Sequence, residues 1–216
     1  MRKGYLAALA LTTLATTNAF AVLPGFYMGL MLGPSTNNGN EVQAQTTSTP
    51  PSTVTATPTS QQFGTRLYMG YKASQNWGAE GGLTYYSGIT YDAGDASTCS
   101  SPNIRIRDFD IVMRGSYTFQ NTGIEVFGKA GPALTYMSTS GCLNPQLDQE
   151  CGKTTYSTQV KPTVSAGVSY DLTQNWVVDA SWNRLFAASP VSSVDMYALG
   201  ISYHFVDTYC GQFLCA

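Results

Sequence analysis

The chain has 216 residues and a formal net charge of −2, with no basic excess of the kind that indicates a nucleic-acid partner. Hydrophobic residues make up 43% of it, but charged residues only 11%, against about 25% in a typical soluble domain. After residue 21 no apolar run reaches the length of about 18 residues that a membrane helix needs. Low charge, 14 Tyr, 21 Gly and no spanning helix together indicate a membrane β-barrel.

The first 21 residues, MRKGYLAALALTTLATTNAFA, have the three parts of a secretory signal peptide. Arg2 and Lys3 supply the positive start, residues 5–15 supply the apolar middle, and Ala19-Phe20-Ala21 is a small-x-small cleavage site. We therefore expect export and a mature chain that begins at Val22. No Cys follows the cleavage site directly, which argues against a lipid anchor.

Eight segments after the signal peptide alternate apolar and small or polar residues, the period of a β-strand. They are Phe26–Gly33, Phe63–Lys72, Trp77–Tyr86, Arg105–Phe119, Ile124–Met137, Tyr156–Tyr170, Trp176–Phe186 and Val194–Phe205. The links alternate between short turns (ASQN, QNTG, DLTQN) and longer loops. Residues 34–62 form a Ser/Thr/Pro-rich tract that we expect to be disordered-like, and residues 206–216 form a short tail.

Loop alternation of this kind is typical of outer-membrane barrels, in which the short turns are periplasmic. In three segments two aromatic residues of the apolar face lie eight residues apart, which places them roughly 20 Å apart along the membrane normal. This spacing fits two interfacial girdles around a lipid-facing band. A soluble lipocalin-type barrel would need many Lys and Glu on its outer face, which this pattern lacks. Pro132 and Pro162 predict a bulge or a local break, since each removes a ladder donor.

The final segment ends in ALGISYHF, with Gly200 followed by Tyr203 and Phe205 two residues apart. This ending resembles the signal that the barrel assembly machinery reads, although Ala198 stands where that signal usually has a polar residue. Together with the strand count, the chain resembles the OmpA-like eight-stranded outer-membrane barrels over residues 26–205. The resemblance implies an all-β, antiparallel, up-and-down transmembrane barrel over residues 22–205, with extracellular loops and both termini in the periplasm.

The inward face carries four basic and four acidic residues, so an interior just wide enough for side chains can be nearly neutral. They are Arg66, Glu80, Asp110, Arg114, Glu125, Lys129, Lys161 and Asp179. Buried charge must be paired, so we expect internal salt bridges that fill the barrel. The alternative is a gate, in which rearranged pairs admit ions or small solutes. In either case Glu80 with Lys129 or Arg114 is the predicted centre.

Arg105, Arg107 and Arg184 have outward parity at the expected extracellular ends of strands. Each could bind lipopolysaccharide phosphates bidentately, or could be an ordinary solvated rim charge.

Cys99, Cys142 and Cys151 fall in outer loops, while Cys210 and Cys215 follow the last strand. An oxidising compartment permits disulfides, and we predict Cys142–Cys151 first and Cys210–Cys215 second. Cys99 is then free or displaces an outer-loop partner.

An enzyme on such a barrel would need an outward Ser–His pair with a carboxylate. The one histidine, His204, has inward parity beside Ser202, so we expect no catalysis, no cofactor and no metal. The predicted function is a non-enzymatic outer-membrane protein for envelope integrity and for surface interaction or adhesion through the loops. A small gated pore is the alternative, and a lipid A-modifying enzyme the third reading. Expected partners are lipopolysaccharide, the barrel assembly machinery and host surface molecules.

Overall fold

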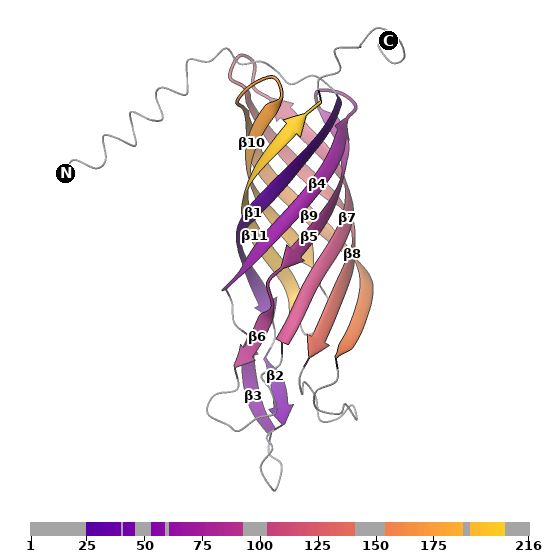
Figure 1. The fold of residues 1–216 in the computed structure, drawn as a ribbon, viewed down its shortest axis with the longest axis vertical. Coiled ribbons are helices and arrows are strands. Elements are labelled where there is room, and N and C mark those ends of the chain that lie inside the picture. The colour runs from indigo at the N-terminus through magenta and orange to yellow at the C-terminus, as the bar shows by residue number, and fades with distance from the viewer. Residues whose placement is uncertain are drawn as a thin grey trace, which may run out of the picture.

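The computed structural model describes residues 25–39, 41–45, 53–58, 61–92, 103–140, 154–187 and 191–205. Eight of its strands form a closed antiparallel barrel, which confirms the predicted fold class (Figure 1). They are β1 (Gly25–Gly39), β4 (Gln61–Lys72), β5 (Trp77–Tyr86), β7 (Asn103–Thr118), β8 (Ile124–Ser140), β9 (Thr155–Asp171), β10 (Trp176–Phe186) and β11 (Val191–His204). No helix in the described residues is long and apolar enough to cross a membrane.

Neighbouring barrel strands follow each other in the sequence, as in a meander, and the ring closes where β1 pairs with β11. One end of the barrel, here called the turn end, carries the links 73–76, 119–123 and 172–175 together with Gly25 and Phe205. The opposite end is the loop end. The backbone N–H of Phe205 donates to Phe26 O at 2.9 Å, so the last described residue is tied to the first strand.

Two turns at the turn end share one hydrogen-bonding pattern, which follows from their similar sequences, ASQNW and LTQNW. The hydroxyl of Ser74 accepts from the Trp77 N–H at 3.1 Å, and the hydroxyl of Thr173 accepts from the Trp176 N–H at 3.0 Å. Side-chain acceptors of this kind pre-form a tight turn. The third turn instead uses positive φ at Asn121 and Gly123, 60° and 68°.

The two strand prolines lie directly opposite each other in the β8–β9 pair, and the register runs past them without a shift. No bulge forms there. On the other side of β8, the β7–β8 pairing is interrupted between Asp110–Ala133 and Met113–Ala130, again without a shift. The structure therefore has a local break and no bulge, because Pro132 cannot donate to β7. A Cβ on Gly131 would lie 2.1 Å from Ile111 O, so the backbones are very close at this break.

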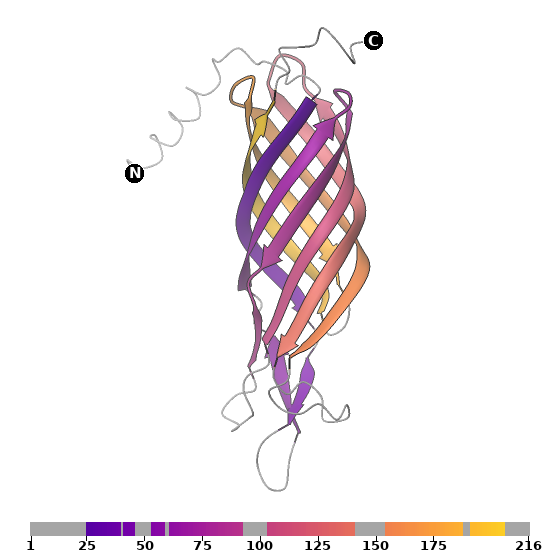
Figure 2. The ribbon, with the colours of Figure 1, turned by 45° about the vertical axis from the view of Figure 1, so that its right-hand side comes forward.

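The tract 34–62 differs from the disordered-like expectation where the structure describes it. Strand β1 runs on to Gly39, and β2 (Val42–Gln45) pairs with β3 (Thr53–Pro58). Strand β3 in turn pairs with β6 (Ile89–Asp92), which pairs with β7. These short strands extend the sheet beyond the barrel at the loop end (Figure 2).

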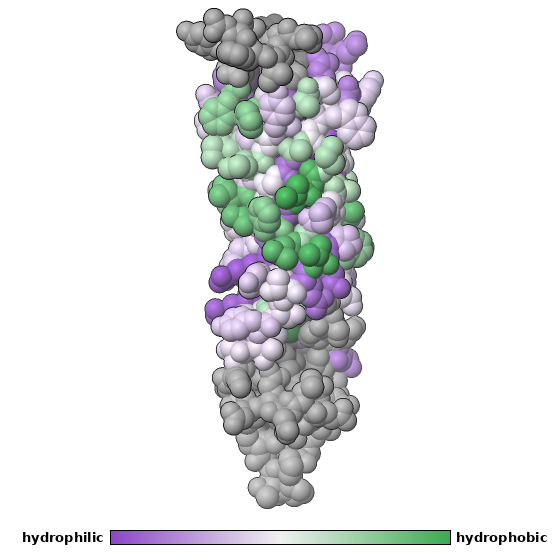
Figure 3. Space-filling model, turned by 90° about the vertical axis from the view of Figure 1, so that its right-hand side faces the viewer, coloured by the Kyte–Doolittle hydropathy of each residue, from purple (hydrophilic) through white to green (hydrophobic). Residues whose placement is uncertain are grey.

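The two faces of the wall have the polarity that the alternation predicted. Large apolar side chains on the outer face are widely exposed, with Leu199 at 72% and Met69 at 66%. On the face shown in Figure 3 the hydrophobic residues gather in a band across the middle, with hydrophilic residues toward both ends. An exposed apolar band flanked by polar rims fits a lipid bilayer.

Several predictions concern segments outside the described residues. These are the signal peptide, the tail 206–216 and all five cysteines. Signal cleavage and the two disulfides therefore remain predictions.

Candidate functional site

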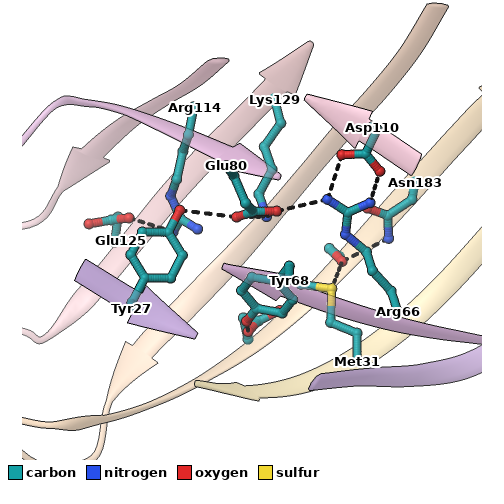
Figure 4. A network of polar contacts seen from close by, with 12 residues as sticks. Tyr27, Met31, Arg66, Tyr68, Glu80, Asp110, Arg114, Glu125, Lys129 and Asn183 are labelled. Atoms are coloured by element: carbon teal, nitrogen blue, oxygen red, sulfur yellow. Dashed lines mark hydrogen bonds and ion pairs between the residues drawn. The ribbon is translucent and has the colours of Figure 1, made fainter. Parts of the chain in front are cut away.

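Glu80 on β5 is the centre of a polar network that fills the middle of the barrel. Its carboxylate accepts hydrogen bonds from Lys129 Nζ at 2.7 and 2.8 Å, from Arg66 Nη2 at 2.9 Å and from the Tyr27 hydroxyl at 3.0 Å. Figure 4 shows Glu80 between Tyr27 and Arg66 and beside Lys129. These donors come from three strands, β1, β4 and β8, and the acceptor lies on β5, so the contact joins four strands of the wall.

Arg66 links this centre to a second carboxylate. Its guanidinium donates to both carboxylate oxygens of Asp110 and also to Thr84 Oγ1 at 3.3 Å. A bidentate Arg–carboxylate pair is among the stronger charge-assisted contacts in proteins. Asp108, two residues before Asp110 on the same face, is 5% exposed and forms no ion pair with a described residue.

A separate cluster around Glu125 lies toward the turn end. Glu125 accepts from Lys72 Nζ at 2.5 Å, from Arg114 Nη2 at 2.7 Å and from Thr118 Oγ1 at 3.2 Å. The Arg114 guanidinium also lies 4.1 Å from the centre of the Phe127 ring. An aromatic face next to a buried cation offsets part of its lost hydration.

Three further interior residues, Tyr68, Asp179 and His204, complete the network. The Tyr68 hydroxyl donates to Asp179 Oδ2 at 3.0 Å, and the Lys129 ammonium lies 5.0 Å from the Tyr68 ring centre. His204 stacks on the Tyr27 ring at 4.9 Å, inside the barrel at the turn end. An interior position keeps His204 and its neighbour Ser202 away from any lipid on the outer surface.

The structure brings together seven of the eight inward charges that the sequence analysis selected, the exception being Lys161. Lys161 is half-buried near the loop end and forms no ion pair with a described residue. Arg114 pairs with Glu125 and not with Glu80. The selection missed Lys72 and Asp108, although strict alternation along β4 and β7 puts both on the inward face and could have identified them.

Toward the loop end the interior also holds a group of buried apolar side chains, which the sequence analysis did not anticipate. We call this group the loop-end apolar cluster; its members are Tyr86, Ile89, Tyr91, Ile104, Ile106, Met137, Leu185, Val191, Val194 and Met196. None of them is more than 7% exposed. A small interior pocket beside Arg114 and His204 has a volume of about 10 Å³, room for at most one water. A hollow of about 470 Å³ lies at the turn end, with Lys72 and Glu125 among its lining residues.

The three outward arginines have different surroundings. Arg184 is paired with Asp195, with Nε to Oδ1 at 2.8 Å and Nη2 to Oδ2 at 2.9 Å. Asp195 also accepts from the Trp182 indole N–H at 2.9 Å. Arg107 lies over the Tyr85 ring, 5.4 Å from its centre, and Arg105 is exposed. Neither Arg105 nor Arg107 has a carboxylate partner among the described residues.

Comparisons with known proteins agree with this architecture. A family model described as "Outer membrane protein beta-barrel domain" matches residues 6–205. An uncharacterized protein of Coxiella burnetii (strain RSA 493 / Nine Mile phase I) is 25% identical over 177 residues, covering 70% of this chain and 71% of the relative. Neisserial surface protein A has a similar structure, with a TM-score of 0.56 and 16% identity, covering 84% of this chain and 97% of the other. OprG from Pseudomonas aeruginosa gives 0.52 and 11%, covering 86% and 99%. At these identities the two structures support the fold alone.

Proposed function

The chain belongs to the outer-membrane β-barrel domain family, and from this premise we propose that it is a non-enzymatic protein of envelope integrity and surface interaction. In the proposed orientation the turn end faces the periplasm and the loop end faces the cell exterior. The observation that carries the proposal is a filled interior combined with strands that continue past the barrel rim at the loop end.

The filled interior favours a structural role over a pore. Permeation would have to break the Glu80 and Glu125 ion pairs and also displace the loop-end apolar cluster. Buried ion pairs resist separation because each charge left alone costs several kcal/mol. We expect silent planar bilayers for the wild-type protein and for Glu80→Ala. Discrete conductance steps that change in Glu80→Ala would instead support the gated-pore alternative.

Surface interaction is supported by one backbone edge of β9, here called the open edge, that pairs with no other described strand beyond Thr163. Its pairing with β10 ends at Thr163, whereas its pairing with β8 continues to Thr155. The Asp171 N–H donates to Gly123 O on the β8 side, so the odd-numbered residues of β9 bond toward β8. The even-numbered residues Tyr156, Thr158 and Val160 therefore direct their backbone groups to the open side.

This edge has the properties of a strand-addition site. The side chains of Tyr156 and Val160 are 71% and 67% exposed. Segments rich in Tyr, Thr and Val favour the β conformation, so this edge could pair with an extended peptide from a partner. Exposed strand edges in natural proteins usually carry charged residues or proline, which discourage pairing with another chain. On this edge Lys161 and Pro162 are such residues, and they lie next to the point where the pairing with β10 ends.

Thr158→Pro tests the surface role, because it removes one edge donor and leaves the bonds from β9 to β8 in place. Thr158→Ala is the matched control, since it alters the same side chain and keeps the N–H. Cells that display the wild-type protein should adhere to coatings of host-cell surface extract or of extracellular-matrix extract better than cells with an empty vector. Thr158→Pro should lose this gain and Thr158→Ala should keep it. No gain on either coating, or equal adhesion of the two variants, would contradict the proposal.

Assembly is expected to use the C-terminal strand. Tyr203 packs edge-on against Phe205 at 5.1 Å, and both rings point outward, where the assembly machinery could read them. Gly200 leaves room inside for Asp179, whose carboxylate oxygens would lie 2.8 Å from an added Cβ. Phe205→Ala should lower the amount of heat-modifiable barrel in the outer-membrane fraction if this ending is recognised.

A further inference from the structure

Five of the eight described Lys and Arg residues of the barrel wall have a carboxylate partner within the chain. Arg66, Lys72, Arg114, Lys129 and Arg184 are each paired at 2.9 Å or less. Among the described residues, the Lys and Arg side chains without such a partner are Lys161, Arg105 and Arg107. The arginines differ from Lys161 because they are adjacent on one face and point away from the barrel.

Arg105 and Arg107 alternate with buried Ile104 and Ile106, so both guanidinium groups project from the outer face. Two residues along a strand separate side chains by about 7 Å. Two positive charges at this spacing repel each other, more strongly beside an apolar surface than in water. An anion that bridges the two guanidinium groups would remove this repulsion.

The surroundings define the anion further. Arg107 lies opposite Tyr85 on β5 and Tyr136 on β8, two aromatic residues that are exposed on the outer face toward the loop end. One step toward the middle of the membrane, Phe109 is flanked by Leu83 and Leu134, all exposed on the outer face. A ligand that fits this surface has an anionic head at the arginines and acyl chains along the apolar band. Arginine binds phosphate bidentately, which favours a phosphorylated lipid.

We propose that Arg105 and Arg107 bind the lipid A phosphates of lipopolysaccharide in the outer leaflet, and that Arg184 does not take part. Arg184 is excluded because Asp195 already neutralises it and occupies its Nε and Nη2 donors. The location in the outer leaflet rests on the proposed orientation of the barrel, whereas the affinity of the site for lipid A does not.

The test compares lipid retention by two variants in nanodiscs. Arg105→Gln/Arg107→Gln removes the proposed site, and Arg184→Gln/Asp195→Asn removes the paired arginine without leaving a lone charge. Each folded protein is placed in phospholipid discs that contain either bisphosphorylated lipid A or its dephosphorylated form, and bound lipid is quantified by native mass spectrometry. Folding is checked by gel mobility without boiling.

We expect the wild type and the Arg184/Asp195 variant to retain bisphosphorylated lipid A equally, and the Arg105/Arg107 variant to retain at least tenfold less. Dephosphorylated lipid A should be retained weakly by all three. Equal retention by the Arg105/Arg107 variant and the wild type would overturn the proposal, as would a similar loss in the Arg184/Asp195 variant. A separate epitope insertion after Gly94, probed on intact cells, tests the orientation, so failure of the orientation and failure of the lipid site can be told apart.

Discussion

Removing the carboxylate of Glu80 should destabilise the barrel strongly, because one cation depends on it alone. Lys129 Nζ contacts both Glu80 oxygens, at 2.7 and 2.8 Å, and its side chain is 1% exposed. Arg66 keeps Asp110 as a partner when Glu80 is lost. The cost of Glu80→Ala is therefore that of one orphaned buried charge, about 3–5 kcal/mol. With a urea m-value of about 2 kcal/mol/M, the unfolding midpoint should fall by roughly 1.5–2.5 M.

The assay is urea unfolding in lipid vesicles of defined composition, followed by circular dichroism and by gel mobility without boiling. Lys129→Met should cost less than Glu80→Ala, because Glu80 keeps Arg66 and the Tyr27 hydroxyl as partners and no charge is fully orphaned. The double variant Glu80→Gln/Lys129→Met replaces the pair by neutral groups of similar volume and should lie within about 1 kcal/mol of the wild type. The reasoning fails if Glu80→Ala costs less than about 1 kcal/mol, or if the double variant costs the sum of the single changes.

Three further substitutions test other parts of the fold by the same unfolding measurement. Gly131→Ala would place a Cβ 2.1 Å from Ile111 O and should cost about 1–3 kcal/mol, so an unchanged midpoint would contradict the close approach of β7 and β8. Met196→Ala should cost about 2–5 kcal/mol because this fully buried side chain packs within the loop-end apolar cluster, and a cost below about 1 would mean that the cluster is loosely packed. Thr173→Ala should cost about 0.5–1.5 kcal/mol by removing the hydroxyl acceptor of the Trp176 N–H, whereas Thr173→Ser should retain stability; equal losses would show that the hydroxyl is not the cause.

The local pattern of the sequence was sufficient for the barrel strands. The predicted ranges Trp77–Tyr86 and Trp176–Phe186 coincide with β5 and β10. Both begin directly after a short polar turn and alternate strictly, so each range is encoded within a few neighbouring residues. Where strands continue past the rim, as in β1 and β8, no alternation of apolar and polar residues marks the end, and the predicted ranges stopped short.

Partner choice inside the barrel could not be predicted in the same way. In the β7–β8 register Arg114 lies opposite Lys129, and Glu125 lies four residues further along β8, opposite Thr118. The Arg114 side chain extends along the inner face and pairs with Glu125. Register between strands depends on the whole sheet, and parity alone says only that two residues share a face. The same limit applies to the surface, where Asp195 lies opposite Arg184 through the β10–β11 register and neutralises it.

The sequence by itself determined that this chain forms an eight-stranded barrel with an apolar outer face and charged residues on the inner face, because side-chain alternation is a property of each strand alone. Only the tertiary structure decided which buried charges neutralise one another, that buried apolar side chains gather in the interior at the loop end, and that Arg105 and Arg107 have no carboxylate partner among the described residues. Those outcomes depend on distances between strands far apart in the chain, and such distances exist only once the sheet has closed on itself.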